Sequence, residues 1–192
     1  LSGKFPAFTV VFGFLLFALI FPLSAIISGA GIVLITLHAG PKNSISIILA
    51  CIIALALVSS VFIGHAPLGA ATAAAQLVPS FILAVIFYST RSLPLSLQAA
   101  ALLGALAFVI VSALFPGSEQ FWQKSLSTIL VPVLETGGYN AEQSALLINQ
   151  TAKFMTGLLI ASIVLVHSSI LLFGYKLKCI VDDSPQFESD FK

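Results

Sequence analysis

The positions of the charged side chains constrain the fold of this chain most strongly. Between Phe5 and Tyr175 they stand only between long apolar stretches, never within one. They are Lys42, Arg91, Glu119, Lys124, Glu135, Glu142 and Lys153. Charged residues make up 8% of the chain and apolar residues 59%, whereas water-soluble domains carry about 25% charged residues. We therefore expect an all-α integral membrane protein, with residues 1–175 forming a single polytopic membrane domain.

The first apolar stretch is too long for one straight crossing. Residues 5–37 would form a helix of about 50 Å, whereas the hydrocarbon core of a bilayer is about 30 Å thick. Pro22 lacks a backbone N–H and clashes with the preceding turn of a helix, so we predict a break near Phe21 and Pro22. The expected spans are residues 5–20, 23–38, 44–63, 70–88, 95–115 and 154–175.

The loop charges favour six transmembrane helices over five. Cytoplasmic loops are enriched in Lys and Arg. With six crossings, one face receives Lys4, Lys42, Arg91, Lys176 and Lys178. Both termini and a polar tail, residues 176–192, would then be cytoplasmic. Five crossings, the alternative, would move Lys4 to the other face.

An amphipathic, extracytoplasmic insert is expected at residues 116–152. Its first helix would be capped by Ser118 and ended by Pro132, because apolar residues recur between them at helical spacing. Asn140 and Gln143 have the spacing of a capping box, which would begin a second helix that continues into the last span. The insert would either lie flat on the membrane surface or form a lid over a cavity between the spans.

Small residues at a spacing of four predict close contacts between helices. Such contacts drive helix association in lipid, where packing replaces hydrophobic exclusion. The candidate packing or partner-interface residues are Ala25, Gly29, Gly69, Ala71 and Ala75. They would pack within the chain or face another subunit.

His167, Gln76 and Trp122 are the candidate ligand-binding residues. His167 lies about midway along the last expected span, where an ionisable group indicates a functional site. A neutral imidazole bonded to a neighbouring hydroxyl or carbonyl would also be stable there. Gln76 is near a proline, Pro79, that would free a backbone carbonyl, although a bond across helices would explain the amide equally well. Trp122 would cover any cavity beneath the insert.

Missing motifs argue against an enzyme. No carboxylate or ammonium group lies within an expected span, and no catalytic, phosphate-binding or metal-binding motif is found. We therefore expect no catalytic residues, no metal and no cofactor. The net charge of +1 is scattered, which excludes nucleic acid as a main partner and leaves the lipid bilayer and membrane subunits.

Several short motifs together resemble a known family. They are Pro22 in the first apolar segment, residues 37–42 (LHAGPK), 90–95 (TRSLPL) and 156–162 (TGLLIAS), and the tail 175–191. In these motifs the chain resembles the YybS-like family of uncharacterised bacterial inner-membrane proteins. Family members generally continue into further spans, which implies a truncated form here. The family is distantly similar to the substrate-binding subunits of energy-coupling-factor importers, which are six-helix proteins without catalytic residues.

These observations lead to two functional hypotheses. The first is a multi-pass protein of the bacterial cytoplasmic membrane that binds or helps transport a small neutral or amphiphilic molecule together with partner subunits. The second is a non-transporting membrane scaffold or assembly factor.

Overall fold

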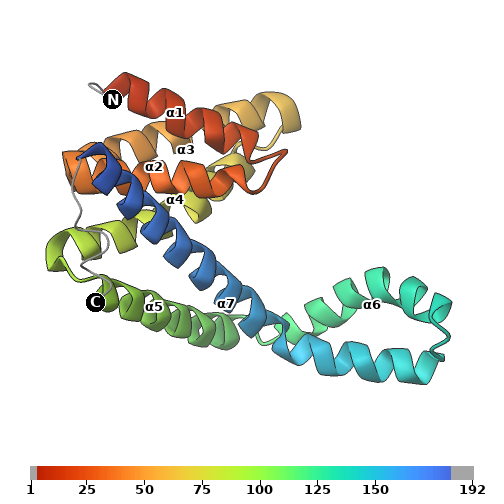
Figure 1. Ribbon diagram of the computed structural model, residues 1–192. Coiled ribbons are helices and arrows are strands. Elements are labelled where there is room, and N and C mark those ends of the chain that lie inside the picture. The colour runs from red at the N-terminus through yellow and green to blue at the C-terminus, as the bar shows by residue number, and fades with distance from the viewer. Residues whose placement is uncertain (1–3, 183–192) are drawn as a thin grey trace. The chain divides into compact units, whose positions relative to one another are not determined.

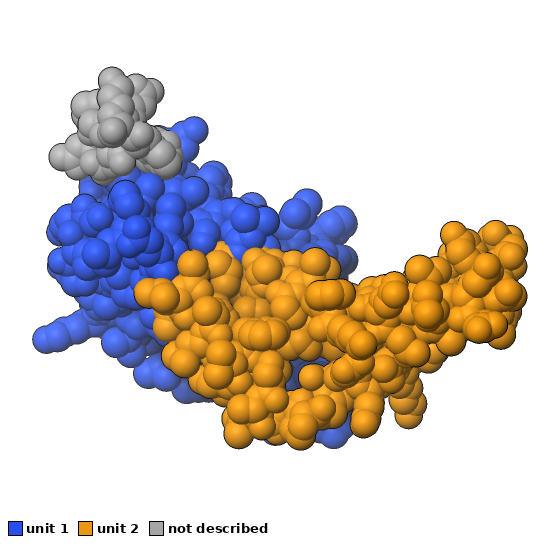
Figure 2. All heavy atoms as spheres, turned by 90° about the horizontal axis from the view of Figure 1, so that it is seen from below, with its two compact units in different colours: residues 1–100, 165–192 blue, residues 101–164 orange. Residues whose placement is uncertain are grey.

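The described part of the protein is entirely helical. A computed structural model describes residues 4–182, which form seven α-helices and no strand (Figure 1). The chain divides into two compact units, residues 1–100 with 165–192 and residues 101–164, here called unit 1 and unit 2 (Figure 2). The all-α class expected from the sequence is therefore confirmed for these residues.

Four helices of the described chain are long and apolar enough to cross a bilayer. They are α3 (Pro41–Ile63), α4 (Ala66–Thr90), α5 (Leu93–Leu114) and α7 (Ala141–Val181). Helices α1 (Lys4–Phe17) and α2 (Ser24–Ala39) are apolar but shorter, and α6 (Ser118–Thr136) carries the polar insert. This composition is that of a membrane-embedded α-helical protein.

Large apolar side chains on α5 are exposed. Leu102 is 71% exposed and Val109 is 62% exposed. A monomeric soluble protein rarely exposes contiguous apolar surface of this kind, because it would remain in contact with water. In lipid these side chains contact hydrocarbon instead of water, so their exposure agrees with a membrane environment.

The predicted break in the first apolar stretch is confirmed. Helix α1 ends at Phe17 and α2 begins at Ser24. The two helices then pack against each other: the Ser28 hydroxyl donates a hydrogen bond to the Val11 carbonyl, 3.1 Å away, and a Cβ on Gly31 would lie 3.1 Å from the Val11 side chain. Helices α1 and α2 therefore form a hairpin (Figure 1).

Helix α4 begins at Ala66, four residues before the expected start. Gly64 ends α3 in the left-handed conformation, with φ of 77°, and its N–H bonds to the Ser60 carbonyl. Pro67 then stands in the first turn of α4. Backbone N–H groups in a first turn have no acceptor within the helix, so the lack of an N–H in proline costs no hydrogen bond there. The Ser59 hydroxyl bonds to the His65 carbonyl at 2.8 Å and fixes the turn. Pro67, which falls between the expected spans 44–63 and 70–88, is therefore part of a helix start.

Helix α7 contributes its C-terminal part to unit 1. Ile170 and Leu171 are fully buried, and the ring of Tyr175 meets that of Phe87 edge-on at 4.7 Å. The helix continues to Val181 rather than giving way to a polar tail after Tyr175, because Cys179, one turn further, is also buried. The remainder of the expected tail, residues 183–192, lies outside the described residues.

The insert forms two helices, with two corrections to the expected boundaries. The N-cap of α6 is Gly117 rather than Ser118, and Pro132 lies inside α6 instead of ending it. Pro132 is exposed, so the carbonyl that loses its helical partner can be hydrated. The capping box at the start of α7 is confirmed, because the Asn140 N–H bonds to Gln143 Oε1 at 3.1 Å and the Gln143 N–H bonds to Asn140 Oδ1 at 2.8 Å.

The contact between α3 and α4 makes a direct stability prediction. A Cβ on Gly69 would overlap the Leu55 carbonyl oxygen and lie 2.5 Å from Cβ of Ser59. We expect Gly69→Ala to lower the free energy of unfolding by about 1–3 kcal/mol, because overpacking forces the helices apart. Thermal unfolding in detergent measures the effect.

Gly13→Ala is the matched control, because nothing lies within 4 Å of a Cβ built on Gly13, which is also helical. This substitution should be neutral or slightly stabilising. Equal melting temperatures for the two variants would contradict the packing described for Gly69.

Candidate functional site

Unit 2 has an apolar hollow of about 530 Å³ at the beginning of α6. The end of α5, the connecting corner, the first turns of α6 and one turn of α7 form its wall. The lining residues are Val111, Leu114, Phe115, Pro116, Gly117, Ser118, Phe121, Trp122, Thr156 and Leu159. We call this the corner cavity.

Backbone hydrogen bonds shape the corner. The Phe115 N–H bonds to the Val111 carbonyl at 2.9 Å, which continues the last turn of α5. Pro116 cannot continue that pattern, since it has no N–H. The Ser118 N–H bonds back to the Phe115 carbonyl at 3.0 Å, and α6 begins directly after this turn. The corner thereby sets Phe121 and Trp122 against the cavity.

Trp122 is held by a hydrogen bond across two helices. Its indole N–H donates to the Thr156 hydroxyl of α7 at 3.0 Å. Its ring meets Phe121 edge-on, with ring centroids 5.4 Å apart. A fixed aromatic side chain of this kind offers apolar area with little further loss of conformational freedom, which suits a binding wall.

The corner cavity suits an apolar or amphiphilic molecule. Its volume lies in the range of about 300–1,000 Å³ that is usual for small-molecule sites. None of its lining residues is titratable, and Ser118 and Thr156 supply the side-chain hydroxyls. Burying an ion against this wall would be costly because no charge compensates it.

The sequence singled out Trp122 but missed the remaining wall. Gln76 and His167, the other two candidates, do not line the corner cavity. The sequence did indicate a turn at this position, because residues 115–117 (FPG) place a proline and a glycine directly after an apolar span.

Gln76 is engaged in a contact between helices of unit 1. Its side-chain amide donates a hydrogen bond to the Ala25 carbonyl at 2.9 Å. The structure therefore brings together two residues that the sequence proposed for different roles. The bond corresponds to the packing alternative considered for Gln76.

His167 is buried in unit 1, with 6% of its surface exposed. The nearby hydroxyls of Ser162 and Ser169 bond to carbonyls of their own helix, at Leu158 and Leu165. These two serines are therefore engaged with the backbone of α7.

The small residues divide into inward and outward positions. A Cβ on Gly29 would lie 2.9 Å from the Ile170 side chain, and Gly69 adjoins Leu55. Both glycines therefore serve packing within unit 1. Ala71 and Ala75 are exposed on α4 and remain available to lipid or to another protein.

The ends of α2 and α7 carry a polar cluster. Asp182 Oδ2 accepts a hydrogen bond from Lys178 Nζ at 2.8 Å, and Oδ1 lies 3.1 Å from His38 Nδ1. Lys178, and to a smaller extent His38, hold the pKa of the Asp182 carboxyl below its ordinary value. The contact is present while this carboxyl is charged and is lost as the pH falls through that lowered pKa.

Metal chemistry has no support among residues 4–182, where no three His, Cys, Asp or Glu side chains group to hold an ion. Cys51 and Cys179 are both free and buried.

No family model, curated protein or solved structure matches this chain.

Proposed function

We propose that this chain is a six-span protein of the bacterial cytoplasmic membrane that binds, or helps transport, a small neutral or amphiphilic molecule together with partner subunits. The corner cavity is the observation that carries this proposal. Its wall is apolar, with hydroxyls at Ser118 and Thr156, and so matches a molecule with an apolar body and a neutral polar group.

The contacts within unit 1 support the proposed orientation. Thr36 Oγ1 donates to Ser44 Oγ, which joins the end of α2 to the start of α3. Phe87 of α4 meets Tyr175, and His38 of α2 meets Asp182, so the ends of α2, α4 and α7 lie on the same side of the unit. The basic residues near these ends are Lys42, Arg91, Lys176 and Lys178. A cytoplasmic location of this side follows from the positive-inside rule.

The hairpin of α1 and α2 favours six crossings over five. Two helices that fold back on each other return the chain to the side on which it entered (Figure 1). They have 14 and 16 residues, which gives lengths of about 21 and 24 Å. A bilayer adapts to short helices by local thinning, at a modest cost per Å.

The proposed need for partner subunits rests on the resemblance to the YybS-like family and, through it, to subunits of energy-coupling-factor importers. No catalytic motif is recognised in the sequence, so we expect the protein to act through partners. A binding subunit that delivers its ligand to other membrane proteins agrees with a cavity that lacks titratable groups.

Leu159→Trp tests the corner cavity. The larger side chain would fill the cavity beside Trp122, so we expect binding of the uncharged fluorophore N-phenyl-1-naphthylamine to weaken about tenfold or more. Fluorescence titration of the purified protein in lipid nanodiscs measures this.

Leu158→Trp is the matched control, because Leu158 is the neighbouring residue on α7 but is 64% exposed and does not line the cavity. It should leave binding unchanged. If the protein does not bind the fluorophore at all, or both variants bind it like the wild type, the proposed site is wrong.

The scaffold hypothesis remains the second candidate, because Ala71 and Ala75 form an exposed small-residue face on α4. If this face holds a partner, replacing both with Leu should abolish co-purification of that partner while fluorophore binding persists. The control is replacement of Ala101 and Ala105, an exposed pair at the same spacing on α5. Loss of co-purification in the α4 variant alone would favour the scaffold, and equal recovery in all variants would contradict it.

A further inference from the structure

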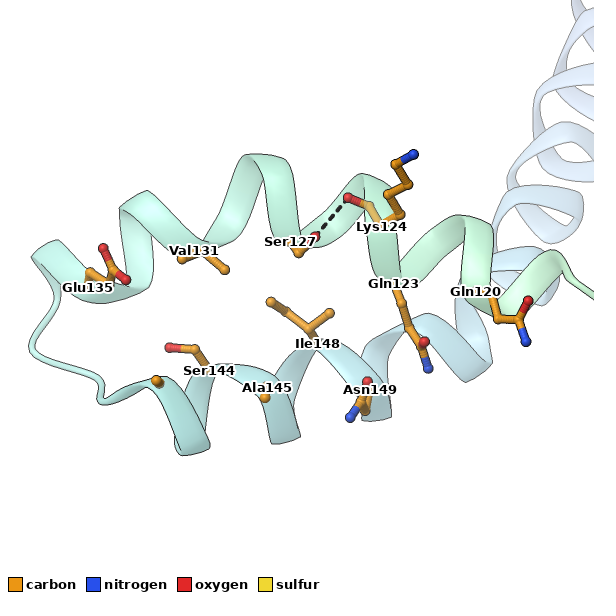
Figure 3. A pocket seen from close by; sticks show the side chains of 11 residues that line it. Gln120, Gln123, Lys124, Ser127, Val131, Glu135, Ser144, Ala145, Ile148 and Asn149 are labelled. Atoms are coloured by element: carbon orange, nitrogen blue, oxygen red, sulfur yellow. Dashed lines mark hydrogen bonds between the residues drawn. The ribbon is translucent and has the colours of Figure 1, made fainter.

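A second hollow in unit 2 lies between α6 and the first turns of α7. It has a volume of about 430 Å³ and is bounded by the two helices of the insert (Figure 3). Its lining residues are Gln120, Gln123, Lys124, Ser127, Val131, Glu135, Ala141, Ser144, Ala145, Ile148 and Asn149. We call it the insert groove; its walls carry side-chain amides, which the corner cavity lacks.

Ser144 is the residue that points to a ligand. It is 2% exposed, and its hydroxyl finds no hydrogen-bond partner within the described residues. Figure 3 shows the side chain directed from α7 toward α6, into the groove. Leaving a buried hydroxyl unpaired costs about 1–3 kcal/mol. A ligand in the groove would supply the missing hydrogen bond.

The other serine of the groove provides a contrast. Ser127 Oγ donates to the Lys124 carbonyl of its own helix at 2.9 Å, as helical serines commonly do (Figure 3). Ser144 makes no such bond, although its backbone N–H bonds normally to the Asn140 carbonyl at 3.0 Å. The unpaired hydroxyl is therefore a property of this position and not of helical serines in general.

The surroundings of Ser144 select an uncharged ligand group. Ile148 is 5% exposed and lies beside it on α7, while Val131 faces it from α6 (Figure 3). The charged residues of the groove, Lys124 and Glu135, are exposed and opposite in sign. An ion placed against Ser144 would lack a compensating charge, whereas a hydroxyl group can both donate to and accept from the serine.

We infer that the insert groove binds a small uncharged polyhydroxyl molecule, of the sugar or polyol class. One ligand hydroxyl pairs with Ser144, and the C–H face of the ligand covers Ile148 and Val131. The amides of Gln120, Gln123 and Asn149 line the groove and supply further donors and acceptors. This inference does not depend on the corner cavity, which has a different wall.

Maltose binding tests the inference. The full chain is placed in lipid nanodiscs free of glycoside detergents and titrated with maltose by calorimetry, with the fluorescence of Trp122, the only tryptophan, as a second signal. We expect saturable binding, about tenfold weaker in Ser144→Ala. Sodium acetate and choline chloride should give no response. Nanodiscs with and without a glycosyl diacylglycerol distinguish a lipid headgroup from a free sugar, and binding of either supports the inference.

Ser162→Ala is the matched control on α7, because the Ser162 hydroxyl is exposed and already bonds to Leu158. It should bind maltose like the wild type. Thermal unfolding without ligand provides an independent readout: removing an unpaired hydroxyl should leave Ser144→Ala at least as stable as the wild type.

Absence of binding to both maltose and the glycolipid would overturn the inference. So would equal affinity of Ser144→Ala and the wild type, or a lower melting temperature of Ser144→Ala, which would show that the hydroxyl is paired inside the protein.

Discussion

Close approach of helix backbones is the interaction on which unit 1 depends. In lipid, apolar side chains gain little by leaving their surroundings, so helices associate through tight packing and hydrogen bonds. Gly69 lets α4 approach the Leu55 carbonyl, and Gly174 lets α7 approach Val33. Polar side chains then bridge the gaps, as Gln76 does to Ala25. The small and polar residues of this apolar chain thereby specify which helices meet.

Unit 2 follows a different principle. Its helix α6 buries no residue fully, and large apolar side chains such as Ile129 and Val133 remain exposed. The fixed contacts are few, among them the bond from Trp122 to Thr156. Because few contacts hold α6, an apolar and a polar hollow remain along it. The helices of unit 1, in contrast, pack tightly against one another. In the proposed function, the insert and the end of α5 recognise the ligand.

Local chemistry explains what could be predicted from the sequence. Pro22 within a stretch too long for one span predicted the break, and Asn140 with Gln143 predicted the start of α7. Pro132 was wrongly expected to end a helix, and the helix start at Ala66, just before Pro67, was missed, because a proline is tolerated at an exposed position or in a first helical turn. The corner cavity and the unpaired hydroxyl of Ser144 could not be predicted, since both arise only when α6 and α7 are set against each other. Trp122 was identified because it belongs to the apolar face of the expected insert helix, which would cover any cavity beneath it.

Labelling of single cysteines tests the central claim, that α3, α4 and α5 cross the bilayer and the basic end is cytoplasmic. Variants with one cysteine at position 43, 65, 92 or 140 are made in a background with Cys51→Ala and Cys179→Ala, and intact spheroplasts are treated with a membrane-impermeant maleimide. We expect labelling of intact spheroplasts at positions 65 and 140, and labelling at positions 43 and 92 only after lysis. Labelling of positions 43 and 65 from the same side would contradict it, because α3 would then not cross the membrane.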